Sequence, residues 1–515
     1  MRHALLLTWL AALACSVPAA GEAAPDGAAL YTQHCAACHG AERLGGTGPA
    51  LLPQNLGRLQ PAQAARAIAM GLPATQMPAF GERLSAEQVE AVVAHVYTPP
   101  AAVPTWDRAQ IEASRVQHHA VQEHARPVFD ADPLNLFLVV EAGDHHVTVL
   151  DGDRLEPIHR FKSRYALHGG PKFSPDGRFV YLASRDGWVS KFDLYTLQTL
   201  VEVRAGINTR NLAVSGDGRY VLVGNYLPHT LVMLRASDLG VEQVIAVGDG
   251  HGKTSRVSAV YDAAPRQSFI AALKDLPEVW EIQYADEPVY YGRVHDYRVE
   301  GPPAVSERFP VRRIVLDDYL DDFFFDPPYE NLIGAARNAR NGQVVSLLVG
   351  RKIADIALSG LPHLGSGITW DYQGKAVMAT PNLKQHEITV IEMGTWQVVK
   401  RIATLGPGFF MRSHDNTRYA WADVFFGKDR DAVHVIDKAT LEIAATLRPS
   451  PGKTAAHVEF TRDGRHALLS IWDMDGALVV YDAHTLREVK RLPMVKPSGK
   501  YNVYNKITRE RGTSH

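Results

Sequence analysis

Two cysteines and a histidine form the motif with the clearest chemistry in this chain. Cys35 and Cys38 are separated by two residues, and His39 directly follows the second cysteine. A CxxC pair alone also fits a thioredoxin-like redox pair or half of a zinc site. The adjoining histidine favours covalent attachment of one haem c, since two thiols add to the haem vinyl groups and the imidazole then lies under the iron. We therefore expect Cys35 and Cys38 to bind haem c and His39 to ligate its iron.

The second axial ligand of such a haem has to come from farther along the chain. A thioether or a second imidazole is expected, and a thioether raises the reduction potential. Met77 is favoured because it stands in a Met-Pro pair within a loop. Met70 is the main alternative, but its Ala-rich helical setting favours core packing. His34 and His95 are further alternatives, which we expect to be surface histidines.

A short loop after this motif predicts how His39 is oriented. Residues 47–51 read Thr-Gly-Pro-Ala-Leu. This resembles the loop of class I cytochromes c, in which a proline carbonyl accepts a hydrogen bond from the iron-bound histidine. The resemblance implies that Pro49 binds the ring of His39, and such a bond tunes the metal. Ala-rich helices of this small all-α domain are predicted around 27–33, 61–70 and 85–96.

The first residues have the order of a secretory signal. A basic start at Arg2 is followed by an apolar run over 4–15 and by small residues up to Ala23. Because the apolar run is too short for a permanent membrane span, we expect residues 1–23 to be a cleaved signal peptide. The mature protein is then expected in the periplasm, with no integral membrane segment. An uncleaved anchor and a lipidated Cys15 are the alternatives.

Length, charge and cysteine count narrow the protein class. A chain of 515 residues is too long for one ordinary core. Lys and Arg total 54 and Asp and Glu total 56, giving a net charge of −2, so no overall field favours a nucleic-acid partner. The chain has three cysteines, which is too few for a disulfide framework in an exported protein of this size.

A Pro-rich break divides the chain into two parts. Residues 97–104 read Tyr-Thr-Pro-Pro-Ala-Ala-Val-Pro, and a helix cannot continue through them. We expect a cytochrome c domain over 24–98 and a polar, His-rich linker with some helix over 99–125. From residue 126 to residue 515 the sequence consists of short β-branched runs and Asp-Gly turns.

The Asp-Gly turns recur with the spacing of a repeat fold. Asp-Gly-Arg turns precede strand-like runs at Phe179, Tyr220 and His466, with a weaker copy at 413–416. A four-stranded unit of about 40–50 residues is typical of a β-propeller blade. We therefore predict a class I cytochrome c domain followed by an all-β, eight-bladed propeller over 126–515. Functional groups are expected just before the Asp-Gly-Arg turns, where the chain enters the innermost strands.

This domain order resembles the cytochrome cd1 nitrite reductase family. The resemblance is carried also by residues 164–168, extends over nearly the whole mature chain and is strongest at 168–185, 206–210 and 497–505. It implies that the propeller binds haem d1 noncovalently, with His168 as proximal ligand of its iron. It also implies that Arg185 and Arg210 face the macrocycle, whose carboxylates suit guanidinium partners. By itself, each arginine is about as well explained by a salt bridge within a blade.

The chain departs from that family at the distal side of haem d1. Nitrite reductases have two distal histidines there. His363 matches one of them, but the region expected to carry the other, 319–328, contains no histidine. Since nitrite reduction needs placed acids, we favour a paralogous activity of this family, in haem d1 biosynthesis. The resemblance implies that a propionate side chain of dihydro-haem d1 is dehydrogenated to acrylate, with electrons passed to haem c. His229 or His386 beside His363 would instead favour nitrite reduction.

Dehydrogenation requires a base near the reacting side chain. We expect His457 to be this base, since it precedes an Asp-Gly-Arg turn and an imidazole titrates near neutrality. Tyr501 is expected to bind the carboxylate or relay the proton, and His363 to ligate the substrate iron. Without the family resemblance, His457 is more simply explained as a structural core histidine.

Three other functions remain open from the sequence alone. The chain could be a nitrite reductase of denitrification, a noncatalytic haem d1 carrier, or a propeller dehydrogenase with a quinone cofactor. The last requires a divalent metal held by oxygen ligands, for which the sequence has no evident carboxylate cluster. Expected partners of the favoured dehydrogenase are dihydro-haem d1, a periplasmic electron acceptor, and nitrite reductase with other haem d1 maturation proteins.

Overall fold

The structure of the chain is a computed structural model. It describes residues 24–57, 59–72, 77–287, 308–335, 341–358 and 360–508. The expected signal peptide, residues 1–23, therefore lies outside the described residues. Within the described part, no helix is both long enough and apolar enough to cross a membrane.

Five short helices form a compact unit at the N-terminal end. They are α1 (Gly27–His34), α2 (Ala36–His39), α3 (Pro53–Leu56), α4 (Pro61–Met70) and α5 (Ala86–Tyr97). The start of α5 is fixed by a capping box, in which Ser85 and Gln88 bind each other's backbone N–H groups. The apolar side chains of α5 pack with Tyr31 and Ile68 in one buried cluster. The three predicted helical stretches are therefore confirmed.

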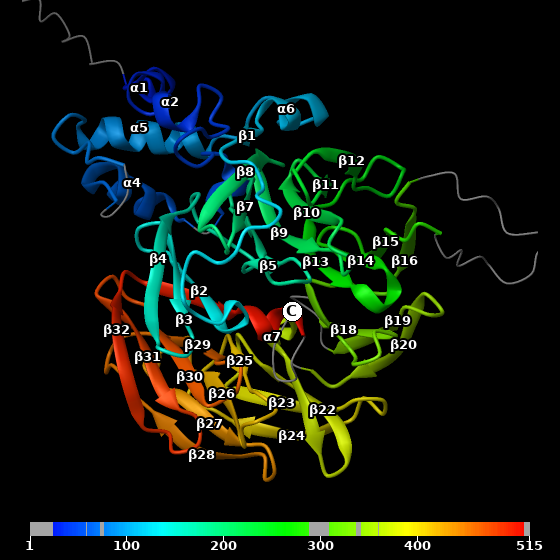
Figure 1. Cartoon of the computed structure of the whole chain (residues 1–515). Helices are drawn as coiled ribbons and strands as arrows, with labels where there is room; N and C mark the ends of the chain where they lie inside the picture. The colour runs from blue at the N-terminus through cyan, green and yellow to red at the C-terminus, as the bar shows by residue number, and fades with distance from the viewer. Residues whose placement is uncertain are drawn as a thin grey trace, which may run out of the picture.

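The rest of the described chain forms eight sheets arranged as a ring (Figure 1). The sheets on the N-terminal side contain β2 (Leu136–Glu141), β3 (His146–Asp151) and β4 (Glu156–Lys162); β5 (Lys172–Phe173), β6 (Phe179–Ala183), β7 (Trp188–Asp193) and β8 (Gln198–Arg204); β9 (Asn208–Val214), β10 (Tyr220–Leu227), β11 (Thr230–Arg235) and β12 (Val241–Ala246); β13 (Val257–Ala263), β14 (Ser268–Leu273), β15 (Glu278–Gln283) and β16 (Val311–Val315).

The remaining sheets complete the eight-bladed propeller. They contain β17 (Asp322–Phe325), β18 (Asn331–Ala335), β19 (Gly342–Ser346) and β20 (Arg351–Ile356); β21 (Ile368–Tyr372), β22 (Lys375–Pro381), β23 (Glu387–Glu392) and β24 (Val398–Ala403); β25 (Met411–Arg412), β26 (Tyr419–Asp423), β27 (Val433–Asp437) and β28 (Glu442–Leu447); β29 (Ala455–Phe460), β30 (His466–Ile471), β31 (Gly476–Asp482) and β32 (Glu488–Met494). Short 3-10 turns lie at Pro133–Asn135, Ala264–Arg266 and Leu364–Ser366.

The last strand closes the ring. β33 (Pro497–Asn502) pairs antiparallel with β2, with Leu138 opposite Tyr501, and is followed by α7 (Val503–Ile507). One blade therefore has the order β33-β2-β3-β4, drawn from both ends of the propeller sequence. Figure 1 shows α7 near the middle of the ring. Because the N-terminal and C-terminal strands share a sheet, the propeller leaves no unpaired edge at the junction.

The predicted Asp-Gly turns join the innermost strand to the next one in three blades. Such turns link β5 to β6, β9 to β10 and β29 to β30. Gly177 has φ +76°, a conformation that residues with a Cβ rarely adopt. Buried apolar residues then fill the space between neighbouring blades; Val189, for example, packs in one cluster with Val221 and Val232. The turn pattern therefore places the innermost strands as predicted.

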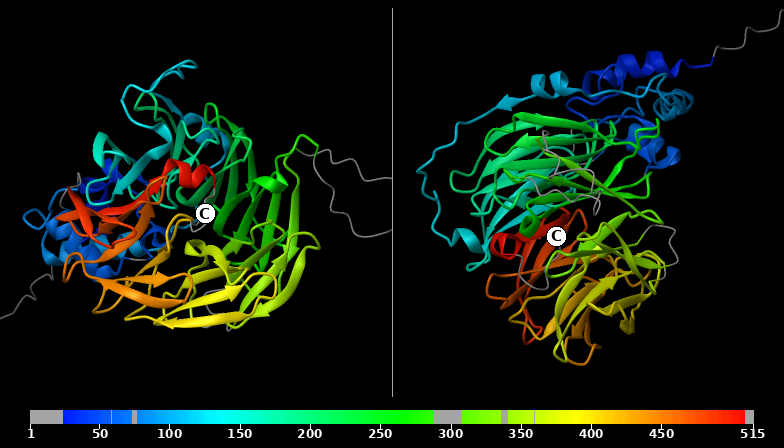
Figure 2. Two further views of the ribbon diagram at one scale, coloured as in Figure 1. Left: turned by 60° about the horizontal axis from the view of Figure 1, so that its bottom comes forward. Right: turned by 90° about the vertical axis from the view of Figure 1, so that its right-hand side faces the viewer.

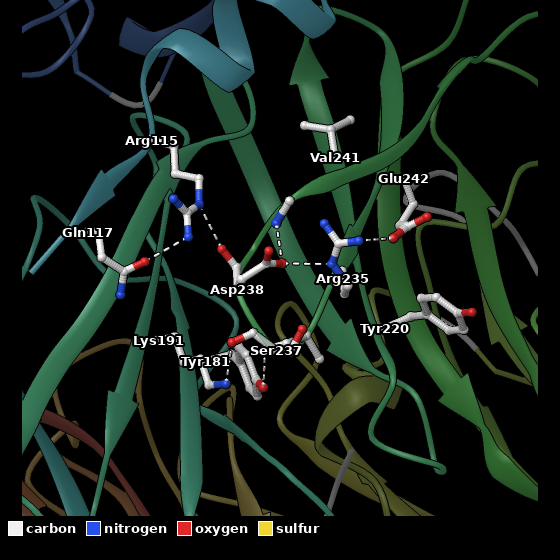
Figure 3. Close-up of polar contacts among 12 residues, drawn as sticks. Arg115, Gln117, Tyr181, Lys191, Tyr220, Arg235, Ser237, Asp238, Val241 and Glu242 are labelled. Carbon is white, nitrogen blue, oxygen red and sulfur yellow. Dashed lines mark hydrogen bonds and ion pairs between the residues drawn. The ribbon is translucent and has the colours of Figure 1, made fainter. Parts of the chain in front are cut away.

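The linker follows the outside of the propeller. It contains α6 (Arg108–Ala113) and β1 (Val116–Gln117), and β1 adds to β8 as a fifth strand. Arg115 Nε donates to the carbonyl oxygen of Asp238 at 2.8 Å, and its Nη2 donates to Gln117 at 2.7 Å (Figure 3). The right-hand view of Figure 2 shows the helical unit and the linker along one side of the blades. The pairing of β1 with β8 therefore joins the linker to the β5–β8 blade, and the bond from Arg115 to Asp238 joins it to the β9–β12 blade.

Candidate functional site

The predicted haem c residues lie together at the junction of α1 and α2. Cys35 is partly buried and ends α1, whereas Cys38 is exposed within the single turn of α2. The ring of His39 is 9% exposed, and its Nδ1 lies 2.8 Å from the carbonyl oxygen of Pro49. Burial lowers the pKa of His39. Donation from Nδ1 leaves the lone pair on Nε2, as iron ligation requires. The predicted contact with Pro49 is therefore confirmed.

The four candidates for the second axial ligand have different environments. Met77 is partly buried against the apolar core of the helical unit. Met70 is 65% exposed, so the prediction that it packs in the core was wrong: α4 buries the face that carries Ala64 and Ile68 instead. His34 and His95 are partly buried rather than on the surface, next to aromatic rings of the same unit. Two thiols, an imidazole and a thioether on this unit fit haem c.

In the propeller, His168 lies between the two predicted arginines. Its Nδ1 is 2.6 Å from the carbonyl oxygen of Arg210. Arg185 Nη2 and Arg210 Nη1 lie 3.1 Å and 2.9 Å from His168 Nε2. Since Nδ1 donates to the carbonyl, Nε2 carries the lone pair and accepts from the guanidinium groups. The structure thus brings His168, Arg185 and Arg210 together, and it leaves His168 in the tautomer that can ligate a metal.

Gly170, two residues after His168, allows the ring of Tyr501 to approach this loop closely. Gly170 has φ +71°, and a Cβ there would lie 2.7 Å from Tyr501 Cε1. A side chain at this position would therefore displace the tyrosine. Burial raises the pKa of Tyr501 to about 12, so its phenol is neutral and can donate a hydrogen bond near pH 7.

His363 comes from the segment just before β21. Its Nδ1 lies 2.6 Å from the carbonyl oxygen of Phe409, and the two rings are 4.3 Å apart. Its Nε2 is 3.9 Å from Asp322 Oδ2. Burial lowers the pKa of His363, Asp322 opposes this effect, and the charge of Arg210 adds to the lowering. Arg210, which binds His168, is therefore close enough to His363 to lower the pKa of its ring. The two histidines thus belong to one site.

The segment that lacks a distal histidine contributes a carboxylate instead. Asp322, at the start of β17, accepts a hydrogen bond from the hydroxyl of Tyr261 at 3.0 Å. His229, between β10 and β11, binds Thr254 at 2.8 Å, and His386 is an exposed side chain before β23. The neighbours of His363 are therefore Asp322 and phenylalanine rings, and the prediction of a missing second histidine agrees with this geometry.

His457 lies on β29 and is 2% exposed. Its ring contacts Phe410 and Tyr501, with centroids 4.7 Å and 5.1 Å away. Burial, followed by the charges of Lys500 and Arg412, lowers the pKa of His457 well below its usual value. The expectation that His457 titrates near neutrality was therefore wrong, because its cationic neighbours lie on other strands. His457 is a neutral imidazole at pH 7.

Sequence reasoning missed a set of charged groups on the innermost strands. Lys172, Arg412 and Glu459 lie on β5, β25 and β29, and each pairs with the third residue of the following strand. The signal was available: charged residues stand at one register in strands that are otherwise apolar. The innermost strands also contribute Arg210, Tyr261, Lys500 and Tyr501.

The electrostatics of this set favour an anionic ligand. Arg412 is 2% exposed, and its Nε lies 3.7 Å from Glu459 Oε2. Neither of these two atoms has a hydrogen-bond partner among the described residues. Burial and the charge of Arg412 lower the pKa of Lys172 to about 8, and the same causes lower that of Lys506. Several cations held close together suit a ligand with several carboxylates.

The helical unit contacts the propeller through the loop that contains Pro49. A small apolar cluster is formed by Ala50, Leu52, Ile207 and Leu227. Asn55 Nδ2 donates to the carbonyl oxygen of Ile207 at 3.3 Å, and Asn208 Nδ2 donates to that of Gln54 at 3.4 Å. This contact joins the loop that orients His39 to the strand that orients His168.

Comparison with known proteins agrees with this two-part organisation. The Cytochrome D1 heme domain model matches residues 131–299 and 304–506. The model for cytochrome C oxidase, cbb3-type, subunit III matches residues 22–96.

Relatives and a solved structure cover nearly the whole chain. Dihydro-heme d1 dehydrogenase of Pseudomonas aeruginosa is 60% identical over 96% of this chain and 97% of its own length. Nitrite reductase of Stutzerimonas stutzeri is 24% identical over 92% of each chain. A solved structure of dihydro-heme d1 dehydrogenase NirN in complex with DHE is 59% identical, covers 94% of this chain and 100% of that one, and has a TM-score of 0.88.

Proposed function

The chain belongs to the Cytochrome D1 heme domain family, and we propose that it is a dihydro-haem d1 dehydrogenase of haem d1 biosynthesis. One observation carries the proposal. His168, His363, His457 and Tyr501, all expected from the sequence, come from separate parts of the ring and converge at its innermost strands. They do so in a chain that is 60% identical to an enzyme of that name.

The proposed reaction is a two-electron oxidation of a substrate side chain. A propionate, –CH2–CH2–COO⁻, becomes an acrylate, –CH=CH–COO⁻, as one hydrogen leaves each of two adjacent carbons. Two protons and two electrons are released. The protein therefore has to hold the macrocycle, remove two electrons and accept two protons, one at a base beside the side chain and the other released to solvent.

His168 and His363 are proposed to hold the substrate iron. Nδ1 of each ring lies near a backbone carbonyl oxygen, so each can present Nε2 to a metal. Arg185 and Arg210 bind His168 Nε2 in this structure. Substrate binding would require them to leave that nitrogen, and the carboxylates of the macrocycle offer new bidentate partners. Lys172 and Arg412 add positive charge for the same groups.

His457 is proposed to accept the proton, and Tyr501 to hold the reacting side chain's carboxylate. A neutral imidazole is ready to accept a proton, and the lowered pKa of His457 keeps it in that form. The high pKa of Tyr501 keeps its phenol a hydrogen-bond donor. Their rings are in contact, so a carboxylate held by the tyrosine would place the neighbouring carbons near the histidine.

Electrons are proposed to leave through the contact between the two domains. Cys35, Cys38 and His39 would hold haem c, which would supply a one-electron acceptor. Ile207 contacts the loop of Pro49, and its strand continues to Arg210, whose carbonyl oxygen binds His168. This route is largely made of backbone. An external electron acceptor then reoxidises the protein.

The remaining assignments follow from the proposed activity and from the sequence. We propose that residues 1–23 are a signal peptide, followed by the cytochrome c domain, the linker and the propeller. Export would place the protein in the periplasm, where a denitrifying cell would use it together with nitrite reductase and other haem d1 maturation proteins.

A spectrum tests the function. Anaerobic protein with oxidised haem c is mixed with dihydro-haem d1, and the absorption of both haems is followed. We expect conversion of the macrocycle to haem d1 while haem c becomes reduced. Binding without conversion would favour a noncatalytic carrier, and turnover of nitrite with an electron donor would favour nitrite reduction; either result overturns the proposal.

A further inference from the structure

Asp423 ends β26 and is 2% exposed. Its Oδ1 accepts hydrogen bonds from the backbone N–H groups of Phe409 at 2.7 Å and Phe410 at 3.0 Å. Its Oδ2 accepts from the N–H of His457 at 3.1 Å. One buried carboxylate therefore joins two segments, the loop before β25 and the bulged part of β29.

The bond to Phe409 extends to His363. The N–H of Phe409 binds Asp423, and the carbonyl oxygen of the same residue lies 2.6 Å from His363 Nδ1. The backbone N–H of Phe409 is thus fixed by Asp423, and its backbone carbonyl oxygen fixes His363. If the loop turned, the carbonyl oxygen would move and His363 would lose the partner that sets its ring orientation and tautomer.

The bond to His457 supports an unusual backbone. The pairing of β29 with β30 shifts between Ala456 and Val458, so His457 lies in a bulge. Its φ is +55°, a conformation that costs about 1–3 kcal/mol for a non-glycine residue and persists only where neighbours enforce it. Asp423 binds its N–H group, and Lys500 Nζ donates to its carbonyl oxygen. Two side chains thus replace the missing ladder bonds.

We propose that Asp423 is a positioning residue that fixes His363 and His457 relative to each other through the backbone of Phe409 and of His457. The inference rests on the proposed function, which assigns substrate ligation to His363 and proton acceptance to His457. Since the bonds of the Asp423 carboxylate go to backbone N–H groups, it acts through the backbone of these segments. It sets where the base stands relative to the ligated macrocycle.

Asp326 provides a matched control. It follows β17, is 5% exposed, and its Oδ1 accepts backbone hydrogen bonds from Glu330 and Asn331, both at 2.9 Å. These bonds close a turn within one blade. An Asp326→Asn variant therefore reports the cost of losing a buried carboxylate that touches neither histidine.

The experiment compares Asp423→Asn, Asp326→Asn and Lys500→Met in the full chain with haem c attached. Asn has the shape of Asp, but its NH2 group cannot accept a hydrogen bond, so one of the two segments loses its acceptor. Three quantities are measured: the spectrum of bound dihydro-haem d1, its dissociation constant, and the single-turnover rate of side-chain oxidation.

We expect Asp423→Asn to slow oxidation by about 100-fold, the size of effect that a displacement of roughly 1 Å produces. The axial-ligand bands of the bound macrocycle should also change. Lys500→Met should slow oxidation but leave those bands unchanged, because of the two histidines Lys500 binds His457. Asp326→Asn should resemble the wild type. If Asp423→Asn does not fold, Asp423→Ser, with a single hydroxyl acceptor, is measured in its place with the same expectation.

The outcomes separate the positioning role from the proposed function. An Asp423 variant with the rate and bands of the wild type, or with no more change than Asp326→Asn, overturns the inference. If the wild-type protein binds dihydro-haem d1 without oxidising it, the proposed function fails. In that case the axial-ligand bands still decide whether Asp423 positions His363.

Discussion

The haem c site and the propeller site both orient a histidine through a backbone carbonyl oxygen, but they differ in how far apart the two residues are in the sequence. In both, histidine Nδ1 lies near a backbone carbonyl oxygen, Pro49 for His39 and Arg210 for His168. The first pair is 10 residues apart, whereas the second is 42 apart and the His363–Phe409 pair is 46 apart. The helical unit therefore builds its site from one short loop, while the propeller site exists only when the ring is assembled.

The largest expected effect follows from opening that ring. Deleting residues 497–515 removes β33, with Lys500 and Tyr501, and leaves β2 with an unpaired edge. We expect binding of dihydro-haem d1 to be abolished while the absorption spectrum of haem c is retained. Deleting only 509–515 is the control and should leave binding intact. Retained substrate binding in the longer deletion would show that the propeller site does not depend on closure.

Replacement of His457 separates binding from chemistry at the propeller site. His457→Ala should lower the oxidation rate by about 10²- to 10⁴-fold, the range of a general base, while the dissociation constant changes little. Stopped-flow absorption measures both. His466→Ala, on β30, is the control for loss of an imidazole near this blade's turn. Unchanged oxidation in His457→Ala would remove it from the catalytic residues.

Replacement of the axial thioether tests the helical unit in the same way. Met77→Ala should lower the haem c potential by on the order of a tenth of a volt, within the ~0.8 V span that axial ligands control. Met70→Ala, at an exposed position, should leave it unchanged. Redox titration checks both. A drop in potential with Met70→Ala alone would reverse the assignment of the ligand.

A smaller effect is expected from pH at the propeller site. The pKa of Lys172 is lowered to about 8, and carboxylates of the substrate would raise it on binding. Binding then takes up a proton above pH 8, so affinity should fall by up to about tenfold per pH unit as pH rises. Titrations between pH 6.5 and 9.5 measure this. The Lys172→Met variant should bind the substrate more weakly near pH 7, and its affinity should depend less on pH. If the variant keeps the wild-type pH dependence, Lys172 is not the group that takes up the proton.

The sequence predicted the parts whose signals are local. The Cys35–His39 motif is contiguous, and the Asp-Gly turns mark where the innermost strands β5, β9 and β29 meet the next strand. Reasoning from separate segments missed Asp322 and Asp423, because their importance comes from neighbours in other segments. The pKa of His457 was mispredicted for the same reason. It is lowered by burial and by the charges of Lys500 and Arg412, which lie in other segments.

The pairing of β33 with β2 also sets an order in time. A chain is synthesised from its N-terminus, so the helical unit can fold before the last blades are complete. Lys500 and Tyr501 arrive last and pair with residues about 360 positions earlier, a contact of high sequence separation and therefore slow to form. Competence to bind the macrocycle is thus acquired in a final step, after the electron-accepting unit is in place.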